Sequence, residues 1–193
     1  MVDKNFWKSK EKDIVFHKDK LNIVESCLDR HAEKNPNKLA FVFENNKIVK
    51  LTYKQLQTEV NKFANYLNSL KIKKDSRIFL FLPKVPEMYI YFLGIIKHGS
   101  IAVPLFEAFQ NEGLYLRLQR GDSDVLITNK ELLKRLNKDA QKKIKTLKHI
   151  LIIDDENFKK ELEKQKTDFK AVLKNKKDTA FMIFTSSTAG TPV

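Results

Sequence analysis

Residues 77–103 read RIFLFLPKVPEMYIYFLGIIKHGSIAV, and this stretch decides the fold class. Its first part, 77–82, is apolar almost throughout, which is typical of a strand buried on both faces of a parallel sheet. After two prolines, residues 87–97 are predicted to form a helix that Gly99 ends, and 101–103 a second apolar strand. A strand, a helix and a strand at this spacing predict a crossover unit of an α/β fold.

Similar elements lie on both sides of this unit. Upstream, two apolar segments that flank Asn45 and Asn46 predict a hairpin, and Thr52 with Gln55 predicts a capping box at the next helix. The Lys-rich stretch 138–148 is predicted to be the softest point of the chain. The predicted strands are 39–43, 47–52, 77–82, 101–103, 125–127, 150–153 and 178–184, and the predicted helices are 23–34, 52–70, 87–97, 113–119, 131–136 and 156–174.

The predicted fold is therefore α/β, with a mostly parallel sheet, flanking helices and an N-terminal hairpin. A length of 193 residues, a hydrophobic fraction of 42% and 14 phenylalanines are enough for one domain with a sizeable core. We expect residues 1–20, which are polar with scattered aromatic side chains, to form an arm that packs loosely on the domain. Residues 21–193 are expected to form the domain itself.

The cysteine content and the apolar runs indicate a compartment. Cys27 is the single cysteine, so no internal disulfide can form, and a reducing compartment is the simpler interpretation. Residues 1–13 are charged and lack the apolar segment of a secretory signal. The longest apolar run, 88–96, is much shorter than the span of about twenty residues that a membrane helix needs. We expect a cytoplasmic protein without a membrane partner.

The chain is strongly basic, with a formal net charge of +13, and the excess is concentrated in one segment. Residues 130–177 contain 16 Lys/Arg and 8 Asp/Glu, a difference of +8. This segment is either a site for a polyanion, such as RNA, a membrane surface or the phosphates of CoA, or a solvated Lys-rich face. Its aromatic residues are Phe158 and Phe169 only, too few to stack bases, so we favour the solvated face and expect no specific nucleic acid. The four histidines are isolated in the sequence, so no metal site is predicted.

The end of the sequence predicts a phosphate-binding loop. The apolar run 181–184 leads into a loop of hydroxyl side chains with one glycine and one proline. Hydroxyls and free backbone N–H groups in a tight turn at a strand end form a concavity that suits phosphate oxygens. The candidate phosphate-binding residues are Thr185, Ser186, Ser187, Thr188, Ala189, Gly190 and Thr191.

This loop resembles the phosphate loop of the AMP-forming acyl-CoA synthetases, whose usual form is Thr-Ser-Gly-Ser/Thr-Thr-Gly-any-Pro-Lys. Matches to that pattern occur at Thr185, Ser186, Thr188, Gly190 and Pro192. Three positions depart from it, and each removes a family feature. Ser187 adds a Cβ in the turn, Ala189 lacks a hydroxyl, and Val193 lacks the positive charge of the lysine.

Further matches make the resemblance specific. The segment Pro104-Leu105-Phe106-Glu107-Ala108-Phe109, hereafter the 104–109 motif, resembles the acetyl-CoA synthetase branch of the family. Residues 82–87 and 51–56 are similar to two other segments of that branch, and the matches run in order from about residue 21 to the end. We therefore expect residues 21–193 to be the N-terminal part of the large adenylating, AMP-binding domain, ending in the phosphate loop.

The resemblance implies a chemistry and its cofactors. Such ligases use ATP with Mg²⁺ to convert acetate to acetyl-adenylate and pyrophosphate, and a CoA thiolate then forms acetyl-CoA and expels AMP. Residues 185–191 would hold the ATP phosphates, and Lys134 and Arg135 lie near where this branch binds the CoA phosphates, although both also fit a solvated helix face. Glu107 has no second carboxylate spaced to pair with it, so no catalytic residue is assigned.

Several interpretations of the function stay open at this point. The resemblance implies that the adenine contacts, the acyl pocket and the mobile C-terminal domain would follow the loop, so the chain is expected to be an acetate–CoA ligase fragment, inactive alone. Alternatively, it is one half of a split ligase that needs a partner chain, a basic module that binds RNA or another polyanion, or a remnant without activity. The substrate acid is inferred from the 104–109 motif only.

Overall fold

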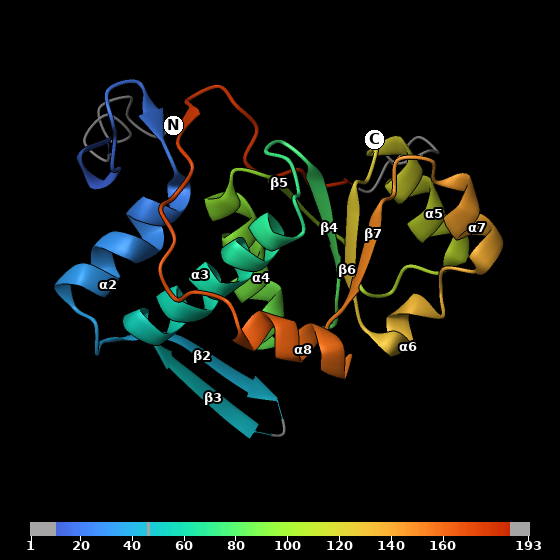
Figure 1. Cartoon of the computed structure of the whole chain (residues 1–193), viewed down its shortest axis with the longest axis horizontal. Helices are drawn as coiled ribbons and strands as arrows, with labels where there is room; N and C mark the ends of the chain where they lie inside the picture. The colour runs from blue at the N-terminus through green and yellow to red at the C-terminus, as the bar shows by residue number, and fades with distance from the viewer. Residues whose placement is uncertain (1–10, 46, 186–193) are drawn as a thin grey trace, which may run out of the picture.

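A four-stranded parallel sheet forms the centre of the computed structural model, which describes residues 11–45 and 47–185 (Figure 1). The strand order is β5-β4-β6-β7, and all three neighbouring pairs are parallel. The strands are β4 (Arg77–Phe81), β5 (Ile101–Pro104), β6 (Val125–Thr128) and β7 (His149–Ile152). This arrangement confirms the predicted α/β fold class.

Helices cover both faces of this sheet, as Figure 1 shows. Ile78 and Leu80 of β4 point to a core shared with the first helix group, whereas Phe79 and Phe81 belong to a second core on the opposite face. Because alternate residues of a strand point to opposite faces, burial on both faces explains why 77–82 is apolar throughout. The first group is α3 (Tyr53–Ser69), α4 (Pro86–His98) and α8 (Glu156–Glu163), and the second is α5 (Asn111–Arg120), α6 (Lys130–Leu133) and α7 (Lys138–Lys143).

The predicted hairpin and its capped helix are confirmed. Strands β2 (Leu39–Asn45) and β3 (Lys47–Thr52) pair antiparallel and lead directly into α3. The Gln55 N–H donates to the Thr52 hydroxyl at 3.2 Å, and the Thr52 N–H donates to the Gln55 side-chain oxygen at 2.9 Å. This reciprocal pair satisfies two donors that the first turn of a helix would otherwise leave free.

The chain before the hairpin is tied to the segment that follows α8. After the short helix η1 (Glu11–Asp13), β1 (Lys20–Leu21) pairs antiparallel with β8 (Lys174–Asn175). The helix predicted over 23–34 is present, and its middle forms a π-helix, η2 (Glu25–Asp29), before α2 (Arg30–Lys34). Nothing in the sequence had indicated the wider π turn.

The helix predicted over 156–174 is wrong beyond residue 163. Residues 164–173, hereafter the strap, cross over α3 without regular secondary structure. Side-chain amides of α3 bind their carbonyls: Asn61 donates to Thr167 O at 2.8 Å, and Asn65 donates to the carbonyls of residues 166 and 168, both at 2.8 Å. These side-chain donors satisfy carbonyls that would otherwise have bonded within a helix. The weak amphipathicity of the segment gave no sign of such distant partners.

Two other segments differ from the predicted elements. A helix that the sequence did not predict, α7, lies in the Lys-rich stretch 138–148, and its first turn is capped by Asn137 through the Ala140 N–H at 2.8 Å. The strand predicted over 178–184 forms one parallel bridge, Phe181 to Ala102 at the edge of β5. Phe181 and Ile183 remain 45% and 64% exposed because the described chain places no further strand or helix on that edge.

Candidate functional site

The carboxyl ends of β4 and β5 border a cavity of about 210 Å³. From β4 the chain passes through α4 to β5 at one side, then returns through α5 to β6 at the other side, so the strand order reverses between β4 and β6. Open α/β sheets bind ligands outside the carboxyl ends of the strands at such a reversal, and this cavity lies at the same edge of the sheet, on the β5 side of the reversal. The cavity is lined by Leu82, Pro83, Lys84, Met88, Tyr89, Leu105, Phe106 and Glu107.

The walls of this cavity are mostly apolar. Phe106 is 63% exposed, and Tyr89 is half-exposed with its ring 5.2 Å from that of Phe41 in the hairpin. Lys84 and Glu107 are the charged residues of the lining. An apolar cavity with a few polar groups at its rim suits an organic ligand that carries a charged group.

The structure separates the two residues predicted to bind CoA phosphates. An Arg135 Nη1–H donates to the backbone carbonyl of Glu107 at 2.5 Å, so this half-buried guanidinium is joined to the 104–109 motif. Lys134 points away, with 72% of its side chain exposed, and pairs with Glu131 at 2.7 Å. The hydrogen bond from Lys134 lowers the pKa of the exposed Glu131 carboxyl. Arg135 is therefore joined to Glu107, a residue of the cavity lining, whereas Lys134 remains exposed on the surface.

Of the predicted phosphate-binding residues, Thr185 alone is described. Ser186, Ser187, Thr188, Ala189, Gly190 and Thr191 lie outside the described residues. Phe184, directly before the loop, is partly buried and packs against the second core, with its ring 6.2 Å from that of Phe79. Gly121 makes room there, since a Cβ at this position would lie 2.4 Å from the Phe79 ring and 3.2 Å from the Phe184 ring.

Arg117 of α5 is a residue of this region that the sequence analysis missed. Its guanidinium carbon lies 3.8 Å from the ring centroid of Phe109 and 5.9 Å from that of Phe184. Its Nη1 donates to Gly113 O at 2.9 Å, and its Nε is buried without a hydrogen-bond partner. Burial lowers the pKa of the Arg117 guanidinium. The signal was available in the sequence, because Arg117 lies between Leu114 and Leu118 on the apolar side of a predicted helix.

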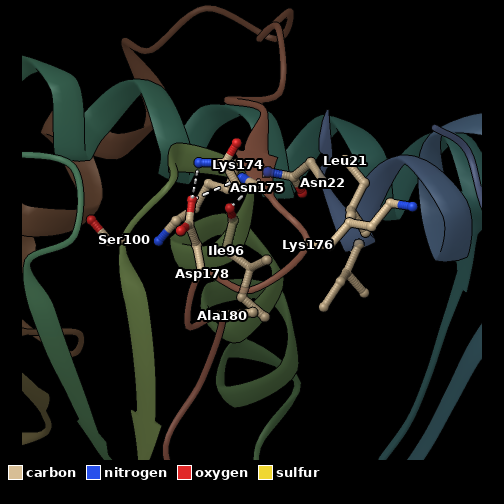
Figure 2. Close-up of a pocket in the computed structure, with 10 residues that line it drawn as sticks. Leu21, Asn22, Ile96, Ser100, Lys174, Asn175, Lys176, Asp178 and Ala180 are labelled. Carbon is tan, nitrogen blue, oxygen red and sulfur yellow. Dashed lines mark hydrogen bonds between the residues drawn. The ribbon is translucent and has the colours of Figure 1, made fainter. Parts of the chain in front are cut away.

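A second, smaller cavity of about 70 Å³ lies at the opposite end of β5, between α4, β1 and β8 (Figure 2). Its polar groups are engaged with protein partners: Lys174 pairs with Asp75 and donates to Thr179 O at 3.0 Å, and Asp178 accepts from the Asn175 N–H at 2.8 Å. Buried Asn22 donates to carbonyls of α4 and the strap at 2.9 and 2.8 Å. The cavity therefore lies where β1, β8 and the end of α4 meet, and the contacts there hold in place the segment that leads to Thr185.

The described part of the chain offers neither a metal cluster nor a membrane-spanning helix. Across residues 11–45 and 47–185, no cluster of three or more His, Cys, Asp or Glu side chains has a metal-binding arrangement. The same residues include no helix with the length and apolar composition needed to cross a bilayer. Lysines of the basic segment pair with carboxylates, among them Lys148 with Asp124 at 2.9 Å and Lys159 with Glu156 at 2.8 Å. These pairs agree with a solvated basic face.

Comparison with known sequences gives one consistent family. A family model described as AMP-binding enzyme matches residues 28–192. The acetyl-coenzyme A synthetase of Bacillus subtilis is 34% identical over 184 residues, covering 90% of this chain and 32% of that protein. Acetyl-coenzyme A synthetase 1 of Saccharomyces cerevisiae is 31% identical over 202 residues, covering 92% of this chain and 28% of that protein. The chain thus spans roughly a third of the length of these curated relatives.

Solved structures show the same architecture. A Brucella canis acyl-CoA synthetase superposes with a TM-score of 0.79 at 22% identity, covering 97% of this chain and 35% of that chain. The anthranilate CoA ligase AuaEII, solved in complex with anthranoyl-AMP, gives a TM-score of 0.80 at 25% identity and covers 91% of this chain and 33% of that chain. The parallel sheet and its flanking helices match the N-terminal portion of acyl-CoA synthetase structures.

Proposed function

Because the chain belongs to the AMP-binding enzyme family, we propose that it forms the phosphate- and CoA-facing part of an AMP-forming acetate–CoA ligase. The observation that carries this proposal is the identity to acetyl-coenzyme A synthetases across nine-tenths of the chain. The cavity at the carboxyl ends of β4 and β5 supports it, because the 104–109 motif forms one of its walls. In the proposed reaction, the carboxylate oxygen of acetate attacks the α-phosphorus of ATP and pyrophosphate leaves. The CoA sulfur then attacks the acyl carbonyl, and AMP leaves.

The proposed roles divide between two regions. Residues 185–191 hold the ATP phosphates through backbone N–H groups and hydroxyls, with Mg²⁺ neutralising part of the phosphate charge. Lys134, whose ammonium is exposed, contacts a phosphate of CoA. Arg135 holds the turn at Glu107 through its carbonyl and thereby shapes the wall that CoA passes. Both chemical steps depend on positioning and charge neutralisation more than on covalent catalysis by side chains.

The described part of the chain exposes apolar surface that the other two thirds of such an enzyme could cover. Phe106, Phe181 and Ile183 are 63%, 45% and 64% exposed on the cavity rim and on the edge beside β5. Further strands and loops, on the same or on a second polypeptide, would cover this apolar surface and supply the adenine and acyl contacts. We propose that acetate activation needs these added parts.

Reconstitution with a relative tests the proposed function. The chain is joined to, or mixed with, the part of the B. subtilis acetyl-coenzyme A synthetase that follows the aligned region, and acetate-dependent exchange of pyrophosphate into ATP is measured. We expect exchange from the joined protein and none from either part alone. A joined protein that folds, as judged by circular dichroism, and shows no exchange with acetate contradicts the proposal. Saturable RNA binding that weakens steeply with salt would instead favour a polyanion-binding module.

A further inference from the structure

β7 lies at the end of the four-stranded sheet, and no strand of residues 11–45 and 47–185 pairs with its outer side (Figure 1). On the inner side, the N–H groups of His149 and Ile153 donate to carbonyls just before and at the end of β6, at 3.3 and 2.9 Å. The backbone groups of successive strand residues point to opposite sides, so Ile150 and Ile152 direct theirs away from β6. The Ile152 carbonyl accepts the Asp155 N–H at 3.1 Å and keeps a second lone pair. This edge therefore offers hydrogen-bonding groups to a further strand.

The outer edge of β7 is open to an approaching segment. A cavity of about 220 Å³ touches three consecutive residues of the strand. Because consecutive side chains point to opposite faces of a sheet, a cavity that touches all three lies along the edge and not over one face. Proteins commonly protect such edges with lysine or proline, and the four residues of β7, HILI, contain neither. The cavity is lined by Ile150, Leu151, Ile152, Tyr66, Asp155, Asn157 and Phe158.

The charges that flank β7 indicate which segment fits. Antiparallel pairing of two copies about Leu151 places Ile150 of each copy opposite Ile152 of the other, so the outward backbone groups can bond to one another. The same register places Lys148 of each copy opposite Asp154 of the other. One register thus satisfies the hydrogen bonds and the charges together, whereas parallel pairing of two β7 strands would set like charges side by side. The edge is complementary to a second copy of itself.

Both flanking charges are accessible. The Lys148 ammonium lies 2.9 Å from Asp124, and 65% of the Lys148 side chain is exposed. Asp154 is exposed, and its Oδ1 accepts the Lys130 N–H at 2.9 Å. We propose that two copies of this chain associate through antiparallel pairing of their β7 strands, which joins the two sheets into one around a twofold axis. Two strands of this length bury a small area, so a dissociation constant on the order of 0.1 mM is expected.

Charge reversal in the full chain tests this register, with sedimentation velocity from about 10 μM to about 1 mM as the readout. Lys148→Glu and Asp154→Lys each create two contacts between like charges in the dimer, and each should weaken it about tenfold or more. An equimolar mixture of the two variants should dimerise like the unmodified chain, because each reversed charge then meets an opposite one. Lys34→Glu and Glu33→Lys are the matched controls, since they reverse exposed charges of α2, far from β7, and should change nothing (Figure 1).

Three outcomes overturn the proposal. The first is an unmodified chain that stays monomeric up to about 1 mM. The second is association that neither reversal weakens, which would indicate another surface of the chain or an open-ended assembly. The third is a mixture that associates no better than its two components. If circular dichroism shows that a reversed variant does not fold, Lys148→Gln and Asp154→Asn replace the pair. Each should then weaken the dimer about threefold, and an unchanged dissociation constant overturns the proposal.

Discussion

Substitution of Asp29 by asparagine should destabilise the chain more than any exposed change of charge. Asp29 Oδ1 accepts from the Lys97 ammonium at 2.6 Å and from Gln57 Nε2 at 2.9 Å, and the Lys97 side chain is 2% exposed. Asp29→Asn removes the counter-charge and leaves the buried ammonium with neutral amide oxygens, that of Asn61 among them, as its acceptors. Losing one member of such a pair costs about 3 kcal/mol, the low end of the range because 15% of the Asp29 side chain is exposed.

Thermal unfolding gives the readout for Asp29→Asn. A loss of about 3 kcal/mol corresponds to a fall of roughly 6–12 °C in the unfolding temperature for a chain of this size. The double variant Asp29→Asn/Lys97→Met should recover part of the loss, since no buried charge is then left alone. Glu163→Gln is the control, because Glu163 pairs with Lys62 at 2.8 Å but is 69% exposed, and its effect should stay below about 1 kcal/mol. The reasoning is refuted if Asp29→Asn costs no more than this control.

Three further substitutions test the packing, the titration and the capping that the structure shows. Gly121→Ala places a Cβ 2.4 Å from the buried Phe79 ring and should cost about 1–3 kcal/mol, measured by urea unfolding. Burial lowers the pKa of His98 to about 4. The unfolded chain therefore binds more protons between about pH 6.5 and pH 4, and the stability present above that window falls by about 3 kcal/mol as pH drops through it, a loss that His98→Asn should abolish. Thr52→Ala removes the capping box with Gln55 and should cost about 1 kcal/mol in the same urea assay, whereas a neutral result would show that tertiary packing alone holds α3.

The sheet and the helices on its faces could be predicted because their signals are local. Uninterrupted apolar runs such as 77–82 occur where both faces of a strand are covered, and β4 is central in the sheet. The end of α4 was equally predictable, since Gly99 has φ 87° and its conformation is one that other residues rarely adopt. These elements follow from spacing and backbone stereochemistry within a few residues.

The strap could not be predicted because its hydrogen bonds come from distant residues. Its carbonyls are bound by Asn61 and Asn65, about a hundred positions earlier in the chain. Within the sequence these asparagines belong to the polar face of a helix and give no sign of a partner. The strand predicted over 178–184 fails for a related reason, since an edge strand forms only as far as its neighbour lies beside it.

At the site, the residue types could be predicted, whereas the direction of their side chains could not. Lys134 and Arg135 are adjacent and basic, and the sequence treats them alike. In the turn after α6, the Lys134 side chain extends into solvent, whereas the Arg135 side chain donates to the Glu107 carbonyl. Arg117 was overlooked because a basic residue on an apolar helix face is usually taken for one whose charged end reaches water.

Lys97 and Arg117 are buried cations that the fold treats differently. Lys97 and Asp29 neutralise each other inside one core. The guanidinium of Arg117 stacks on the ring of Phe109 at 3.8 Å and donates to Gly113 O, and no Asp or Glu among residues 11–45 and 47–185 forms an ion pair with it. Removal of Asp29 therefore takes away a counter-charge that the fold itself supplies, whereas the described contacts of Arg117 are an aromatic face and a backbone carbonyl. The large effect expected of Asp29→Asn follows from this difference, because a buried charge that loses its partner is strongly unfavourable.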